Sequence, residues 1–114
     1  MSGLEPVAYN DGAIGLTGWL AQPQGVPRAA VVVFPTIVNV NPAMERRARM
    51  LAEAGYLAMI ADFYGEAVAN FEASGPLAQK LRSDPHTYRA RLRAAIAALG
   101  SLPDAAGLPM AAIG

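Results

Sequence analysis

Cysteine is absent from this 114-residue sequence, and histidine occurs once, at His86. Without cysteine the chain has neither a disulfide scaffold nor a thiolate metal site, and a single histidine excludes a multi-histidine metal centre. Charged residues are also scarce, at 16%, against 54% hydrophobic residues. This composition excludes an intrinsically disordered chain, which would be richer in charge and poorer in apolar residues.

An excess of either charge is missing too, because nine Lys and Arg balance nine Asp and Glu. A neutral balance argues against nucleic acid or an anionic membrane surface as the main partner. No apolar run approaches the roughly 20 residues that span a bilayer. Residues Met1–Pro6 lack the basic and apolar blocks of a secretion signal. We therefore expect a cytoplasmic protein that binds neither nucleic acid nor membrane.

The length suits one small domain. Even when compact, a domain of this size buries only about two-thirds of its unfolded surface. The sequence holds more core-type residues than one such domain readily hides, so we expect the chain to be part of something larger.

Three short apolar runs are typical of strands buried on both faces of a parallel sheet. They cover Ala29–Phe34, Leu57–Ala61 and Leu108–Ile113. Ahead of them, Val7–Pro23 predicts a β-hairpin, because Asn10–Gly12 is a strong turn signal.

Two segments carry the signals of helix ends. In the first, Asn41–Pro42 predicts the cap and the first helical position, and Gly55 a left-handed end. The second begins in the same way at Asp84–Pro85 and is expected to end at Gly100. Its apolar stripe is expected to contain Tyr88, Leu92, Ala95, Ile96 and Leu99.

The order of elements is hairpin, strand, helix, strand, helix, strand. The Ala-rich segment Glu66–Lys80 adds a shorter helix after Gly75–Pro76. This order predicts an α/β fold, with a hairpin followed by parallel strands and flanking helices in three αβα layers. No helix follows the last strand to cover it, and an open sheet edge invites association. Gly114 therefore resembles a truncation point.

The loop Pro35–Asn41 follows the first parallel strand, where open α/β sheets bind ligands. It contains no glycine, and no dinucleotide or P-loop motif occurs in the chain, so we expect no cofactor. Its polar side chains before the helix cap are Thr36 and Asn39. The pattern alone is compatible with an ordinary connection as well as with a ligand-binding loop.

Among the remaining candidates, Asp62 either shapes its turn or acts as a catalytic carboxylate, and the first interpretation is favoured. Tyr64 either lines a pocket with its hydroxyl or fills space. His86, at a helix start with no nucleophile nearby, is expected to be a surface or cap residue. No serine lies in a G-x-S-x-G motif. A basic cluster, interpreted as a solvated helix face or a carboxylate-binding patch, contains Lys80, Arg82, Arg89, Arg91 and Arg93.

Three stretches together resemble one known family. Residues Val31–Asn41 are similar to its strand and following loop. Leu51–Tyr56 with Ala61–Gly65 is similar to the signature LAExGY…xDxYG, the most specific of the three. Arg89–Ala94 with Met110–Gly114 is similar to the helix and strand before the nucleophile elbow. The chain resembles the N-terminal half of the dienelactone hydrolase family, which has the α/β-hydrolase fold.

The resemblance implies a hydrolase of carboxylic esters or lactones. Gly114 would be the first Gly of G-x-C-x-G or G-x-S-x-G, so that residues 1–114 are the N-terminal portion of one domain. The Cys or Ser nucleophile, the Asp and the His would lie beyond residue 114. The Ile37 backbone N–H would supply half of the oxyanion hole.

Side chains expected to line the substrate pocket are Thr36, Val38, Asn39 and Tyr64. The family usually has Glu where this chain has Thr36, so the resemblance implies a dienelactone hydrolase-like esterase rather than a dienelactone substrate. Asn39 stands where Gly is usual, and Asn also tolerates positive φ.

Two alternatives remain open at this point. The chain could be a non-catalytic α/β module that associates through its open sheet edge, or a flavodoxin-like cofactor binder, which the glycine-free loop disfavours. The partners expected are a small ester or lactone and either a missing C-terminal half or a second copy at the open edge.

Overall fold

The computed structural model describes residues 4–114. A hairpin of β1 (Glu5–Asp11) and β2 (Ile14–Ala21) precedes three short strands, β3 (Ala30–Val33), β4 (Leu57–Ile60) and β5 (Met110–Ile113). The five strands form one sheet in the order β1-β2-β4-β3-β5. Within it, β3 pairs in parallel with β4 and β5, whereas the hairpin joins antiparallel through β2. The hairpin and the parallel strands are thus confirmed, with the last strand beginning two residues later than predicted.

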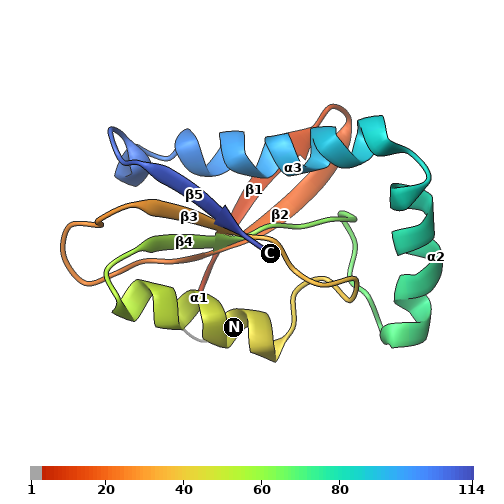
Figure 1. The fold of residues 1–114 in the computed structure, drawn as a ribbon, viewed down its shortest axis with the longest axis horizontal. Coiled ribbons are helices and arrows are strands. Elements are labelled where there is room, and N and C mark those ends of the chain that lie inside the picture. Colours follow the sequence, from red (N-terminus) through yellow and green to blue (C-terminus); the bar gives the residue numbers. More distant parts are fainter. Residues whose placement is uncertain (1–3) are drawn as a thin grey trace.

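Three helices surround this sheet (Figure 1). They are α1 (Pro42–Glu53), α2 (Phe71–Arg82) and α3 (Pro85–Gly100), and a short 3₁₀ helix, η1 (Pro103–Ala105), follows. Figure 1 shows α1 on one side of the sheet, α3 on the other, and α2 beyond the ends of the strands. The predicted α/β architecture with three layers is confirmed.

Alternate residues of the central strands β3 and β4 pack into two separate hydrophobic cores. Val32 and Met59 pack with residues of α3, whereas Val33 and Ile60 pack with residues of α1. Every residue of β3 and β4 is buried, as expected for strands covered on both faces. The carboxyl ends of these two strands are therefore held firmly against both helical layers.

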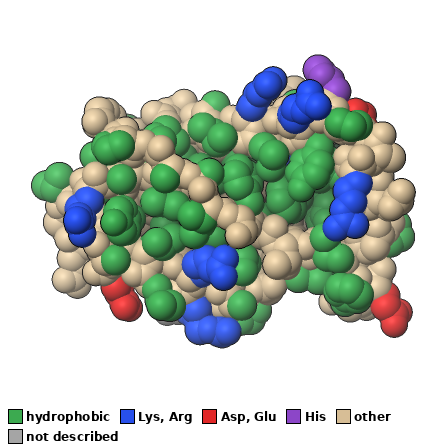
Figure 2. Space-filling model, in the orientation of Figure 1, with side chains coloured by type: hydrophobic (Ala, Val, Ile, Leu, Met, Phe, Trp, Pro, Cys, Tyr) green, Lys and Arg blue, Asp and Glu red, His purple; other side chains and the backbone are tan. Residues whose placement is uncertain are grey.

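The edge strand β5 differs from its neighbours, because all four of its residues are exposed. Its large apolar side chains, Met110 and Ile113, are exposed, and so is Met50 of α1, which lines a hollow together with Ile113. Figure 2 shows hydrophobic side chains spread over the middle of the face that carries β5. This strand has no covering layer within residues 4–114.

Helix α1 begins and ends where the sequence predicts. The Asn41 side chain accepts a hydrogen bond of 3.0 Å from the Met44 N–H, and Pro42 is the first helical residue. Gly55, two residues beyond the last helical one, has a φ of 99°. These local signals fix the direction in which the chain leaves β3 and enters β4.

Helix α2 was predicted to begin after Gly75–Pro76, and this is wrong. It begins at Phe71, because the Asn70 side chain caps it by accepting a hydrogen bond from the Ala73 N–H at 2.8 Å. Pro76 lies inside the helix and cannot donate to the carbonyl four residues earlier. Glu72, whose carbonyl this leaves open, is exposed, so water can satisfy that carbonyl.

Helix α3 differs from expectation at its end and on its face. Gly100 is its last helical residue, and Ser101 caps it in right-handed conformation, so Gly100 is not a left-handed stop. Its small size matters instead, since a Cβ there would lie 3.2 Å from Met110 Sδ. Ile96, predicted in the apolar stripe, is exposed, while Arg91 is buried. Within residues 4–114, no helix has the length and apolar character to cross a membrane.

Candidate active site

Two turns lie side by side where β3 and β4 end. The first, Thr36–Asn39, connects β3 to α1, and the second, Asp62–Gly65, follows β4. Because β3 and β4 run parallel, both turns come to the same edge of the sheet. Side-chain hydrogen bonds link them directly, as described below. This edge is the candidate active site.

The Thr36–Asn39 turn closes with a hydrogen bond of 2.8 Å from the Asn39 N–H to the Thr36 carbonyl. Asn39 has a φ of 64°, the left-handed region that Asn tolerates better than most residues. The Ile37 N–H, in contrast, donates to no other atom of residues 4–114. This turn therefore carries a backbone donor that the fold itself does not use.

Asp62 organises the second turn. Its Oδ1 accepts hydrogen bonds of 3.0 Å from the N–H groups of Tyr64 and Gly65. Its Oδ2 accepts one of 3.0 Å from the Thr17 N–H of β2. The residue is only 8% exposed. The interpretation of Asp62 as a residue that shapes its turn is confirmed.

Asn39 joins the two turns through its side chain. Its Nδ2 donates to Asp62 Oδ1 at 2.8 Å, and its Oδ1 accepts from the Phe63 N–H at 3.0 Å. With 7% exposure the side chain is buried, and both polar atoms of its amide are satisfied. Its backbone forms the turn while its side chain holds the neighbouring one.

Tyr64 makes a second connection between the turns. Its hydroxyl donates to the Ile37 carbonyl at 2.8 Å. Burial raises the pKa of this phenol, which would be protonated and able to donate at neutral pH even without that shift. Ile37, whose N–H is unused, is thus held in place by a hydrogen bond to its carbonyl oxygen.

Behind the second turn, Arg91 reaches in from α3. Its Nε donates to Asp11 Oδ2 at 2.9 Å, and its Nη1 donates to the Phe63 carbonyl. The guanidinium therefore ties the hairpin, the Asp62–Gly65 turn and α3 together. Phe63 also packs against the rings of Phe34 and Tyr88.

Tyr9 supports the same turn from β1, where its hydroxyl accepts a hydrogen bond of 3.1 Å from the Asp62 N–H. Burial raises the pKa of Tyr9 to about 12. Tyr9 was not singled out from the sequence, and Arg91 was named only within the basic cluster, not as a support of this turn. Arg91 does lie four residues before Ala95 and eight before Leu99, on the buried side of α3, so helical spacing could have indicated its burial.

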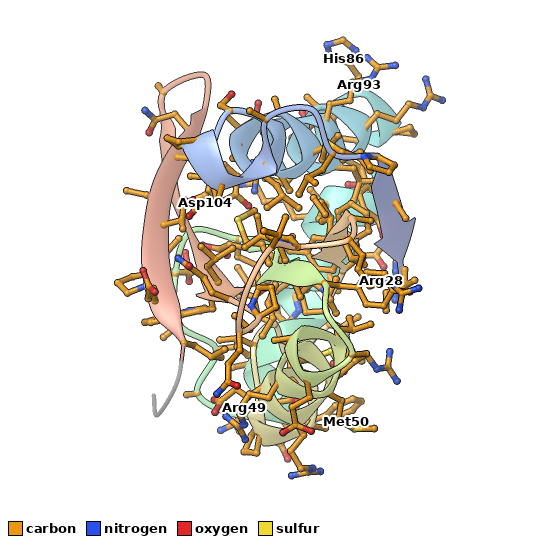
Figure 3. All side chains as sticks on the ribbon, turned by 90° about the vertical axis from the view of Figure 1, so that its left-hand side faces the viewer. Arg28, Arg49, Met50, His86, Arg93 and Asp104 are labelled. Carbon is orange, nitrogen blue, oxygen red and sulfur yellow. The ribbon has the colours of Figure 1, made fainter. Side chains whose placement is uncertain are left out.

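The other predicted residues fall into two groups. Thr36 is exposed, while Ile37, Val38 and Tyr64 are half-buried at the sheet edge. His86 lies on the outside of α3, and Figure 3 shows it pointing away from the sheet together with Arg93. The expectation of a surface histidine is confirmed. In the basic cluster only Arg91 is buried, so the solvated helix face describes its other four members.

A groove of about 390 Å³ opens beside Tyr64. It lies between the Asp62–Gly65 turn, α2 and α3, and its walls include Phe63, Leu77, Lys80 and Thr87.

No group of three or more His, Asp or Glu side chains within the described part of the chain comes close enough to hold a metal ion.

Gly65 closes the second turn under tight steric limits. Its φ is 75°, and a Cβ at this position would lie 2.6 Å from the Gly15 carbonyl oxygen of the hairpin. This backbone oxygen cannot move aside as the end of a flexible side chain could. The close approach of the turn to β2 therefore requires glycine.

Comparison with known proteins identifies the family of this chain. A sequence model of the dienelactone hydrolase family matches residues 16–114. No curated protein sequence matches the chain significantly. Among solved structures, a dienelactone hydrolase-like promiscuous phosphotriesterase, P91, from metagenomic libraries is 35% identical with a TM-score of 0.89. The match covers 97% of this chain and 48% of P91.

Two further structures give the same result. A protein called m3DLH is 34% identical, with a TM-score of 0.86 and coverage of 97% of this chain and 48% of m3DLH. Dienelactone hydrolase from Anabaena variabilis shares the fold, with 22% identity, a TM-score of 0.70, and coverage of 96% of this chain and 50% of that enzyme. The chain thus spans about half the length of each of these three structures. It belongs to the dienelactone hydrolase family, whose fold is that of the α/β-hydrolases.

Proposed function

We propose that this chain is the part of a carboxylic-ester or lactone hydrolase that supplies one donor of the oxyanion hole. The donor is the Ile37 N–H, and Thr36 and Val38 beside it line the substrate site. The Cys or Ser nucleophile follows residue 114, in a segment that corresponds to the other half of the matched structures. Family membership supports the hydrolase class.

In the proposed reaction the nucleophile attacks the ester carbonyl carbon, and the carbonyl oxygen becomes an oxyanion. The Ile37 N–H donates a hydrogen bond to that oxygen, together with the N–H of the residue after the nucleophile. Collapse of the tetrahedral intermediate expels the alcohol and leaves an acyl-enzyme. Water then attacks the acyl carbon, the acid is released, and the nucleophile is regenerated.

The single observation that carries the proposal is the unused Ile37 N–H at the carboxyl edge of β3. Most backbone N–H groups of a folded chain are paired. A donor of a half-buried residue, left without a partner at the edge of the sheet where ligands of α/β folds bind, is suited to a charge that develops only during a reaction.

The decisive variant is Ile37→Pro, assayed in the intact protein with an activated aryl ester. Proline removes the N–H and is favoured at the second position of a β-turn, which residue 37 occupies. We expect kcat to fall by about 10²-fold or more, while the control Ile37→Val, which keeps the N–H, retains wild-type kcat. Full activity of Ile37→Pro would overturn the assignment of the donor.

The substrate class can be tested in parallel, because P91 is a promiscuous phosphotriesterase as well as dienelactone hydrolase-like. An activated phosphotriester offers a phosphoryl oxygen to the same donor. We expect carboxylic esters to be hydrolysed faster, and an intact protein inactive on both would contradict the proposed function. Residues 1–114 alone should show no burst of product from either substrate.

A second candidate is a non-catalytic module that pairs through β5. The observation favouring it is the exposure of all four β5 residues next to the exposed Met50 side chain. Sedimentation separates the two candidates. A compact, monodisperse dimer of residues 1–114 would support the non-catalytic module. Aggregation of residues 1–114 would support the proposed hydrolase, in which the other half of the protein covers β5.

A further inference from the structure

We propose that Asn39 and Tyr64 are positioning residues for the oxyanion donor rather than residues that line the substrate pocket. They hold the Thr36–Asn39 turn in the backbone form in which the Ile37 carbonyl is bonded to Tyr64 while the Ile37 N–H is free. This inference rests on the proposed function, and it names the residues on which that function's geometry depends.

The side chain of Asn39 is turned toward the neighbouring turn rather than toward a substrate. It is buried, its Nδ2 donates to Asp62 and its Oδ1 accepts from the Phe63 N–H. Glycine would also permit the φ of 64° at this position. Only asparagine combines that conformation with a connection to the next turn, so its presence here points to a second task.

Tyr64 acts at the other point where this turn can vary. A β-turn can exchange between two forms by flipping its central peptide, which here joins Ile37 to Val38. The Tyr64 hydroxyl donates to the Ile37 carbonyl at 2.8 Å and so favours one of the two. A flip would break this bond and release a carbonyl oxygen at the edge where an oxyanion must bind, and that oxygen would repel the developing charge.

The turn is therefore restrained by its own closing bond, by the Asn39 side chain and by Tyr64. None of these restraints uses the Ile37 N–H. Asp62 completes the arrangement, because its Oδ1 accepts both from Asn39 Nδ2 and from the Tyr64 N–H, which places the two restraining side chains relative to each other.

The test measures kcat and KM of the intact protein for Tyr64→Phe and Asn39→Gly on the activated ester. Tyr64→Phe removes one hydroxyl, and Asn39→Gly keeps positive φ while removing the connection. A donor that is present but poorly placed stabilises the transition state less, so kcat falls while KM stays constant. We expect about a tenfold fall in each, smaller than the effect of deleting the donor.

The matched control is Asn41→Ala, which removes a side-chain hydrogen bond of similar length two residues along the same loop. It makes no contact with the second turn, so its kcat should equal that of the wild type at a temperature where all variants are folded. If Asn39→Gly fails to fold, Tyr64→Phe decides alone.

The outcomes separate this inference from the proposed function. One outcome is that Ile37→Pro is inactive while Tyr64→Phe and Asn39→Gly keep the wild-type kcat. This result would overturn the positioning role and leave the donor assignment unchanged. A raised KM with unchanged kcat would assign these residues to substrate binding instead. An active Ile37→Pro variant would overturn the assignment of the Ile37 N–H as the oxyanion donor. The positioning roles of Asn39 and Tyr64 would be overturned with it.

Discussion

Two neighbouring turns at the same edge of the sheet differ in how their polar groups are used. In the Asp62–Gly65 turn one carboxylate accepts four hydrogen bonds, from Thr17, Asn39, Tyr64 and Gly65. In the Thr36–Asn39 turn the Ile37 N–H has no acceptor among residues 4–114. The Thr36–Asn39 turn depends on the Asp62–Gly65 turn, because the Asp62–Gly65 turn supplies the hydrogen bonds that restrain it. The proposed oxyanion donor and the hydrogen bonds that hold it thus belong to two different loops.

The largest effect is expected from Asp62→Ala, which destroys the bonded turn. It removes the acceptor of four hydrogen bonds and leaves the buried Asn39 amide without one partner. We expect the free energy of unfolding to fall by about 4 kcal/mol or more, given about 1–3 kcal/mol for each unsatisfied buried group. Urea denaturation measures this. A loss no larger than that of an exposed substitution would show that the turn is held by packing instead.

A smaller loss is expected from Arg91→Met, which removes the support behind the same turn. Methionine keeps the apolar stem, but the Phe63 carbonyl loses its donor and Asp11 its ion pair. Asp11 keeps some exposure to water, so we expect a loss of about 2 kcal/mol. The exposed Arg89→Met in the same helix should change stability little. Equal stability of both variants would contradict the structural role of Arg91.

In the partly bonded turn, comparing Asn39→Ala with Asn39→Gly separates backbone conformation from side-chain bonding. Both variants lose the connection to Asp62, but only alanine must also adopt a φ of 64°. We expect Asn39→Ala to be less stable than Asn39→Gly by about 1 kcal/mol. Thermal unfolding at matched concentration tests it, and the reverse order would mean that the turn relaxes out of the left-handed conformation.

The smallest effect at neutral pH concerns Tyr9, because it appears only in alkaline solution. Burial raises its pKa in the folded protein to about 12 from 10.0, so between these values the unfolded chain binds fewer protons than the folded one. Stability from this group is present below pH 10 and is lost as pH rises toward 12. Tyr9→Phe should show a shallower fall in unfolding free energy over this range. Parallel curves would indicate that Tyr9 is not buried as described.

Signals carried by adjacent residues made much of the fold predictable. Asn41–Pro42 and Asp84–Pro85 fix both helix starts because a cap and its proline act within one turn. Gly100 and Arg91 were misjudged because their roles depend on distant partners, Met110 and Asp11. Pro76 was misjudged because the Asn70 cap starts the helix five residues ahead of it. For the site, the resemblance indicated which loop matters. That the Tyr64 hydroxyl bonds Ile37, 27 residues earlier, follows only from the tertiary arrangement.

The close approach of Gly65 to the hairpin carries a practical lesson for engineering. With a φ of 75° and a backbone oxygen 2.6 Å from where a methyl group would sit, this position accepts no other amino acid without moving β2. Libraries that aim to change substrate preference should therefore randomise Thr36 and Val38 and leave residue 65 fixed. Variants altered there would be lost to misfolding before their catalysis could be screened.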